Sequence, residues 1–314
     1  MSFHKWFLSN QIKKVGVKQK VNGFTLIELL VGLVIATLVI TPLLGFMVSI
    51  LDNDRKEQAK ATTEQEMRAA LDYISKDMQQ AVYIYDADGI DAIRSQLPRY
   101  AQKNQYFPVL VFWKRQYISG GLTVGTGNDD TFVYSLVAYY VIKDNDSTWS
   151  NAARIGRFQI SNGYGQTETD IGNTRDAGFQ MFNLSNEGDL KTKMNQWTKK
   201  SGENYSQQVL ALVDYIDQTT TDTTANPAPS CSNGQMVPTF SGSGDSVATN
   251  NVKVRGFYVC VDSTKTVAEV YLRGNALARI QNTNLNFDQS SESRKIYFPQ
   301  ASARLQGLGF VFTK

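Results

Sequence analysis

The most strongly apolar part of the chain is a long run near the N-terminus. Residues 24–51 contain no Lys, Arg or Asp and one Glu, Glu28. As a helix this run would be about 40 Å long, which exceeds the ~30 Å hydrocarbon core of a bilayer. Gly32, Pro42 and Gly45 interrupt it, and both residue types are more frequent in membrane helices than in soluble ones. The pattern predicts a transmembrane helix over 24–51.

Beyond this run the apolar positions keep a helical spacing but occupy one face only. Intervals of three and four residues separate Met67, Leu71, Ile74, Met78, Val82 and Tyr85. The preceding stretch, 52–70, is rich in helix formers and has no Gly or Pro. We therefore expect one helix from about Phe24 to about Tyr85, with 52–86 as an amphipathic continuation whose apolar face packs on a sheet.

The remainder, 87–314, has the pattern of a β-rich head. Its candidate strands are short runs of β-branched and aromatic residues between turn residues, namely Val109–Trp113, Phe132–Ile142, Arg157–Ile160, Val252–Val261, Thr266–Leu272, Lys295–Phe298 and Gly309–Phe312. VKVRGFYVCVD and TVAEVYLRG predict a hairpin. Gln207–Ile216 predicts a short helix, because its apolar residues share one helical face. The whole pattern predicts an α+β fold with a mainly antiparallel sheet, and about 230 residues suffice for a real core.

A low-complexity stretch at 217–251 breaks the head. It contains QTTTDTTANPAPS and SGSGDS around a short apolar island at Met236–Phe240. Long loops inside compact domains are usually functional or mobile. Two interpretations stay open, a loop that contacts a partner and a plain insertion.

Charge is concentrated at the N-terminus. The first 23 residues hold five lysines and no acid, so the positive-inside rule keeps them in the cytoplasm and sends the rest across. The chain has 32 Lys+Arg against 29 Asp+Glu, and without the leader lysines the balance is 27 − 29 = −2. Without a basic bias, nucleic-acid binding is an unlikely function for the remainder.

The segment GFTLIELLVGLV, Gly23–Val34, resembles the class III signal of type IV prepilins and pseudopilins. A carboxylate inside an apolar run is costly and is kept mainly where it has a task. The resemblance implies that 1–23 is a cleaved leader, that a prepilin peptidase cuts after Gly23, and that Phe24 is then N-methylated. It also implies that Glu28 guides assembly and that the fold is pilin-like.

Further resemblances narrow the family. ALDYISKDMQQA, Ala70–Ala81, is similar to the amphipathic helix of the larger minor pilins and pseudopilins. LVAYYVIK and VYLRGNALARI are similar to segments of pseudopilins associated with hormogonium polysaccharide secretion in filamentous cyanobacteria. These likenesses imply a structural subunit that initiates or caps a pilus-like or type II secretion-like filament, for secretion or motility.

The implied partners are the prepilin peptidase, other pilins or pseudopilins, the inner-membrane assembly platform and the membrane itself. The implied location is the inner membrane, with a single span, a cytoplasmic N-terminus and a periplasmic head. A signal-anchored periplasmic binding module and a tip adhesin for glycan or DNA stay open as alternatives. An ordinary secretory signal has its small-residue cleavage site after the apolar run, whereas the glycine of this chain precedes that run.

The two cysteines, Cys231 and Cys260, fall in the low-complexity stretch and in a predicted strand. Outside the cytoplasm an oxidising compartment allows them to form a disulfide. Two reduced thiols are the alternative. Without CxxC spacing there is no support for a redox or zinc motif.

Enzymatic chemistry has little support in the residue inventory. His4, the only histidine, lies in the leader, so Ser/His/Asp triads and the usual histidine metal sites are excluded from the remainder. DADGID, Asp86–Asp91, and DNDST, Asp144–Thr148, each echo part of a calcium loop but lack the closing bidentate Glu. We expect no catalysis, no cofactor and no metal site.

Overall fold

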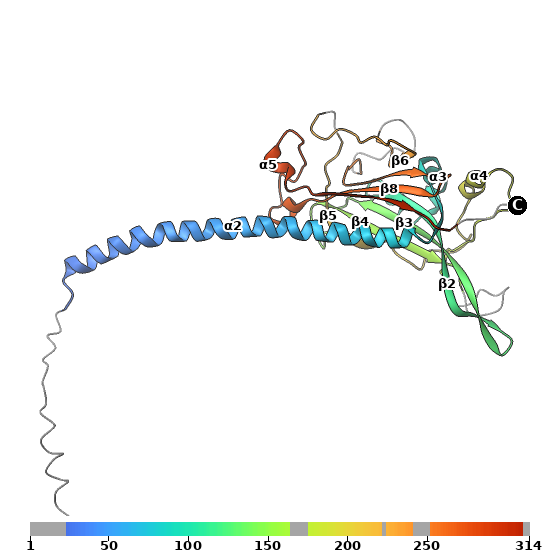
Figure 1. Ribbon diagram of the computed structural model, residues 1–314, viewed down its shortest axis with the longest axis horizontal. Helices are drawn as coiled ribbons and strands as arrows, with labels where there is room; N and C mark the ends of the chain where they lie inside the picture. The colour runs from blue at the N-terminus through green and yellow to red at the C-terminus, as the bar shows by residue number, and fades with distance from the viewer. Residues whose placement is uncertain (1–22, 164–174, 222–223, 241–251, 310–314) are drawn as a thin grey trace, which may run out of the picture. The chain divides into compact units, whose positions relative to one another are not determined.

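The computed structural model describes residues 23–163, 175–221, 224–240 and 252–309 (Figure 1). It divides into two units, Met1–Asn53 and Asp54–Lys314. The dominant helix, α2 (Leu26–Met78), contributes residues to both. The head that follows is β-rich, so the predicted α+β layout is confirmed.

The elements after α2 are β1 (Ala81–Ile84), α3 (Ala87–Ile93), η1 (Arg94–Gln96), η2 (Tyr100–Gln102), β2 (Tyr106–Val124), β3 (Gly127–Ile142), β4 (Ala153–Ser161), α4 (Leu190–Asn195), β5 (Leu210–Ile216), β6 (Gln235–Val237), β7 (Phe257–Asp262), β8 (Val267–Arg273), η4 (Ala276–Arg279), α5 (Glu292–Lys295) and β9 (Gln300–Gln306). Five of the seven predicted strands overlap β2, β3, β4, β7 and β8. The predicted hairpin is the β7–β8 pair.

The described strands form two antiparallel sheets. The larger has the order β1-β2-β3-β4-β5, and the smaller has the order β6-β7-β8-β9. An isolated antiparallel bridge between Ile216 and Gly274 joins the end of β5 to the segment after β8. The β2–β3 hairpin extends beyond the strands that flank it (Figure 1).

One hydrophobic core unites the second half of α2 with both sheets. The helix contributes Met67, Ala70, Ile74 and Met78, which are all nearly inaccessible to solvent. The predicted amphipathic face therefore packs on a sheet as expected. Trp113 of β2 lies fully buried in the same core and contacts the rings of Phe179, Phe182 and Trp197 edge-on.

The helix ends earlier than predicted. It stops at Met78, and the predicted last turns are instead a short turn followed by β1. All four residues of β1 are buried, and β1 pairs with β2 through Tyr83 and Ile84. Cross-strand packing of β-branched and aromatic side chains outweighs the weak preference of the same residues for a continued helix.

Two further predicted elements are wrong. Gln207–Ile216 is not a helix, because its second half is β5. The register of β5 on β4 is irregular, and Tyr215 has a positive φ of 58°. Because of this bulge, Val213 and Ile216 are both buried although they are three positions apart in the sequence. A separation of three positions is also typical of one face of a helix.

Lys295–Phe298 is not a strand but the end of α5 and a turn. Phe298 packs instead in a small separate cluster with Leu277, Leu285 and Phe287. The strand at this edge is β9, which the sequence did not indicate. Of the predicted strand Gly309–Phe312, Gly309 is irregular and the rest lies outside the described residues.

A buried carboxylate ties the last turn of α2 to three strands. Asp77 accepts hydrogen bonds from Lys114 Nζ of β2 (2.7 Å), Tyr139 Oη of β3 (2.7 Å) and Arg157 Nε of β4 (2.8 Å). The side chains of Asp77 and Lys114 are 7% and 6% exposed. Burial raises the pKa of Asp77, but the charges of Arg157 and Lys114 outweigh it and hold the pKa below its usual value.

A second polar attachment lies closer to the N-terminus of α2. Arg279 of η4 donates from Nε to Thr63 Oγ1 (2.8 Å) and forms an ion pair with Glu66. Thr63 is buried and also donates to the carbonyl of Ala59 (2.8 Å). The head therefore holds α2 by polar bonds at two levels.

The first part of the low-complexity stretch is anchored inside the head. Asp217 is inaccessible and accepts bonds from Arg273 Nε (2.7 Å) and from the Thr219 backbone N–H (2.9 Å). Arg273 Nη2 also donates to Asn226 Oδ1 (2.7 Å), and Asn226 is itself buried. This portion of 217–251 is thus part of the core and not a plain surface insertion.

In the structure the two cysteines are joined by a disulfide. The Cα atoms of Cys231 and Cys260 are 5.7 Å apart, and the bridge has a sequence separation of 29. Cys260 lies in β7, whereas Cys231 precedes β6. The bridge therefore ties the low-complexity stretch to the smaller sheet.

The Asp77 cluster generates a stability prediction. Asp77→Asn should lower the free energy of unfolding by about 3–5 kcal/mol, because it leaves the buried Lys114 and the half-buried Arg157 without a counter-charge. Asp72→Asn is the matched control, since Asp72 pairs with Lys76 on the exposed side of the same helix and such pairs contribute about 0.3–0.5 kcal/mol. Denaturant unfolding followed by tryptophan fluorescence measures both. Equal losses in the two variants would contradict the assigned role.

The same cluster predicts a pH dependence. A carboxylate whose pKa is depressed in the folded state stabilises the fold above its unfolded pKa of about 3.9, and this contribution is lost as the pH falls through the folded value. We expect the stability of the unmodified protein and of Asp72→Asn to fall below about pH 4. Asp77→Asn should lack this component, and identical acid slopes in all three proteins would count against it.

The disulfide predicts a local response to reduction. Closing a loop of about thirty residues contributes ~3 kcal/mol by the chain-entropy estimate. Reduction should increase hydrogen exchange around Cys231, between the buried Asn226 and β6, before it affects the sheets. Non-reducing peptide mapping of protein from its native compartment should recover one linked peptide pair, and two freely alkylated thiols would refute the bridge.

Candidate assembly segment

The helix α2 begins with a reciprocal pair of side-chain bonds. The Glu28 backbone N–H donates to Thr25 Oγ1 (3.3 Å), while Glu28 Oε2 accepts from the Thr25 backbone N–H (3.1 Å) and from Thr25 Oγ1 (3.0 Å). This is a capping box, in which the first and fourth residues satisfy each other's orphan donors. The carboxylate also lies in the first turn, where the helix dipole favours negative charge. Glu28 therefore has a local structural task.

The capping bonds use one carboxylate oxygen. Within the described part of the chain, the side-chain bonds of Glu28 all involve Oε2, and Oε1 is left available. A carboxylate has about four lone-pair sites. Glu28 can therefore cap its own helix and still accept a donor from another molecule.

The helix that follows presents apolar side chains to its surroundings on every side. Every residue from 23 to 55 is exposed, and Phe24 and Leu26 are 86% and 85% exposed. By length and composition α2 can cross a membrane. So much exposed apolar surface marks a segment that lipid or other helices must cover.

The threonines and glycines in the first half of this helix are compatible with a surrounding of lipid or other helices. Thr37 Oγ1 donates to the Val34 carbonyl (2.9 Å), and Thr41 Oγ1 donates to the Thr37 carbonyl (2.7 Å), so both hydroxyls are satisfied within the helix. A Cβ atom added at Gly23, Gly32 or Gly45 would meet nothing within 4 Å. Packing within the chain thus gives no reason for glycine at these positions, and any requirement must come from another molecule.

The first acidic cluster of the head has structural partners. Asp86 caps α3 by accepting from the Gly89 N–H (3.0 Å), and its other oxygen pairs with Lys191 Nζ (2.7 Å). Lys191 also pairs with Asp88 (3.0 Å). A lysine at the centre of these carboxylates supplies the positive charge that a cation would otherwise provide.

The second acidic cluster is satisfied in the same way. Asp144 accepts two bonds of 2.6 Å from Arg154, and Asp146 accepts from the Thr148 N–H (2.9 Å). No group of three or more His, Cys, Asp or Glu side chains that could hold a metal occurs among the described residues. His4 lies outside them.

A capped apolar helix that leads into an antiparallel β head defines the class, an α+β protein built for membrane anchoring. Residues 18–44 match the family model of the prokaryotic N-terminal methylation motif, which is the class III signal of type IV pilins and pseudopilins. The N-terminal segment therefore carries the signal motif of type IV pilins and pseudopilins. Neither the curated proteins nor the solved structures include a significant match.

The sequence pattern points to Gly23, Phe24 and Glu28, and the role of Thr25 was not predicted. The structure places these four residues at the start of α2, with the cysteine pair in the head. The spacing T-x-x-E directly before an apolar run is the signature of a capping box. That signal was present in the sequence and could have identified Thr25.

Proposed function

We propose that the mature chain is a large minor pilin or pseudopilin, a non-enzymatic subunit that initiates or caps a type IV pilus-like or type II secretion-like filament. The observation that carries the proposal is the methylation motif at the start of a helix whose apolar first half is exposed throughout residues 23–55. The size of the head supports a low-copy position, because major pilins must fit a dense lattice. The filament would serve secretion, with polysaccharide as a candidate cargo, or motility.

Processing is the first step of the proposed function. A prepilin peptidase removes residues 1–23 by cutting after Gly23, and Phe24 becomes the N-methylated first residue. The lysine-rich leader favours a cytoplasmic N-terminus in the inner membrane, with a single span and a periplasmic head. The open space around Gly23 is consistent with a glycine requirement that originates in the peptidase.

Assembly is the second step. The assembly platform moves the helix from lipid into the filament core, where the Glu28 carboxylate meets the Phe24 amine of a neighbouring pilin. Two charges are stable in such a core only if they pair. The capping box supports this role, because it holds the side chain in one orientation and leaves Oε1 for the incoming amine.

The position of the N-terminus tests processing. Mass spectrometry of the purified protein should find a chain that begins at N-methylated Phe24. Gly23→Val should leave the longer precursor in the membrane, because a β-branched side chain does not fit where the family needs glycine. A mature chain that begins at Met1 would identify a signal-anchored binding module instead.

Three substitutions separate the two roles of Glu28. Glu28→Gln preserves the capping box, in which Gln can replace Glu, but removes the charge. Thr25→Ala removes the cap at a cost of about 1 kcal/mol and keeps the charge, and Glu28→Ala removes both. We expect all three variants to insert and to be cleaved.

The measurement is the amount of tagged protein in sheared filaments or co-purified with partner pilins, relative to the membrane pool. Glu28→Gln and Glu28→Ala should both fail to assemble, whereas Thr25→Ala should assemble. If Thr25→Ala fails and Glu28→Gln assembles, the glutamate acts only as a helix cap. Normal assembly of Glu28→Ala would remove any role for this side chain.

A further inference from the structure

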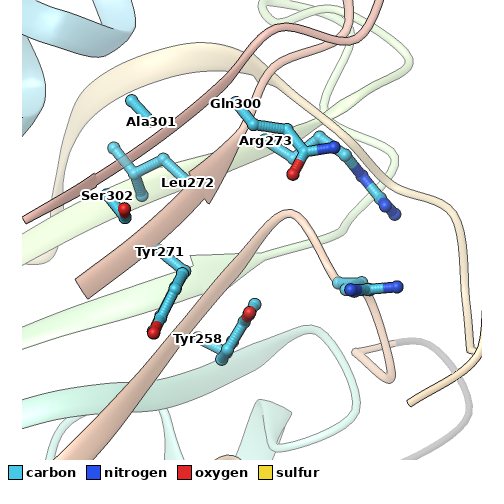
Figure 2. A pocket seen from close by; sticks show the side chains of 8 residues that line it. Tyr258, Tyr271, Leu272, Arg273, Gln300, Ala301 and Ser302 are labelled. Atoms are coloured by element: carbon cyan, nitrogen blue, oxygen red, sulfur yellow. The ribbon is translucent and has the colours of Figure 1, made fainter. Parts of the chain in front are cut away.

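The smaller sheet carries a pocket that the proposed function does not use. Its cavity has a volume of about 230 Å³ and is lined by residues of β7, β8, β9 and the segment before β7 (Figure 2). Most of the contributing side chains are aromatic, cationic or neutral polar, and Leu272 and Ala301 are apolar. Ligand pockets combine apolar and aromatic walls with a few polar groups that orient the ligand, and this lining has both.

The aromatic wall follows from the strand register. Tyr258 of β7 lies opposite Tyr271 of β8, which in turn lies opposite Ser302 of β9. The two rings stack with centroids 4.6 Å apart and an interplanar angle of 4°. Ser302 is small and exposed, so the third position of this row leaves room beside the ring of Tyr271, as Figure 2 shows.

The charge of the pocket comes mainly from one arginine. Arg273 is neutralised, because its guanidinium pairs with the buried Asp217. Arg255 donates from Nη1 to the Pro227 carbonyl (3.0 Å) and shares a side-chain hydrogen bond with Tyr258, and among the described residues it forms no ion pair with a carboxylate. A guanidinium has five donors, so Arg255 retains several donors and a positive charge.

We propose that this pocket binds an anionic sugar unit, with the carboxylate of a uronic acid on Arg255 and the sugar ring against Tyr271. A guanidinium matches a carboxylate through two parallel hydrogen bonds. The apolar face of a pyranose suits an aromatic ring, and its hydroxyls suit the amide of Gln300 and the hydroxyl of Ser302. The ligand class is therefore an acidic polysaccharide, recognised one residue at a time.

The same observations disfavour nucleic acid. Binding a DNA or RNA strand depends on several Lys or Arg contacts to successive phosphates along an extended groove. This cavity is compact and has one arginine without a counter-charge. A single anionic group on a ring-shaped ligand fits that arrangement better than a chain of phosphates.

The test uses the full mature chain in detergent and three probes at neutral pH. Tetragalacturonate represents the acidic glycan, maltotetraose is the neutral glycan, and a twelve-nucleotide oligo-dT represents nucleic acid. Titration calorimetry should show saturable binding of tetragalacturonate only. No binding, equal affinity for maltotetraose, or preferential binding of oligo-dT would each overturn the proposal.

Three variants locate the binding site. Arg255→Gln should weaken tetragalacturonate binding by about tenfold or more, which is the effect of losing a charged hydrogen-bonding partner. Ser302→Phe fills the space beside Tyr271 and should have a similar effect without altering any charge. Arg304→Gln is the matched control, because Arg304 is an exposed arginine of β9 outside the lining.

The control variant should retain its affinity within about twofold. An equal loss in Arg304→Gln and Arg255→Gln would show non-specific charge attraction and would refute the pocket. If Arg255→Gln does not fold, Ser302→Phe decides the outcome. The assay does not depend on filament assembly, so this inference can fail while the pilin function stands, and the reverse also holds.

Discussion

The architecture of the head depends on one buried carboxylate at the end of α2. Asp77 gathers a lysine, a tyrosine and an arginine from three consecutive strands. The first residue of β1 pairs with Lys114, the same residue whose ammonium group binds Asp77. One ionic contact thus joins the end of the helix to a defined position in the larger sheet. A different alignment would leave a buried charge without its partner, which is energetically costly.

The elements predicted correctly from the sequence are those that depend on residues close to one another in the chain. The apolar run and the one-sided stripe that includes Met67 and Ile74 are local patterns, and both were predicted correctly. The end of α2 was missed because residues 81–84 are decided by pairing with β2, a distant contact that no local pattern records. β5 was misread because a bulge at Tyr215 changed its period.

The candidate site shows a similar division. The energetic cost of a carboxylate in an apolar run was sufficient to single out Glu28. Its bonds to Thr25 show that part of this cost is offset within the helix itself. Spacing could have predicted that contact, whereas the pocket beside Tyr271 depends on the alignment of β8 with β9 and could not have been found from the sequence.

The two polar attachments of α2 have a mechanical consequence. Thr63 and Asp77 are fourteen positions apart, which is about 21 Å along a helix axis. Under a tensile load directed along that axis, both anchor points would resist sliding at the same time. Parallel loading in shear withstands more force than bonds that open one after another, as in a zipper. The head is therefore coupled to its helix in a way that suits a protein that is pulled.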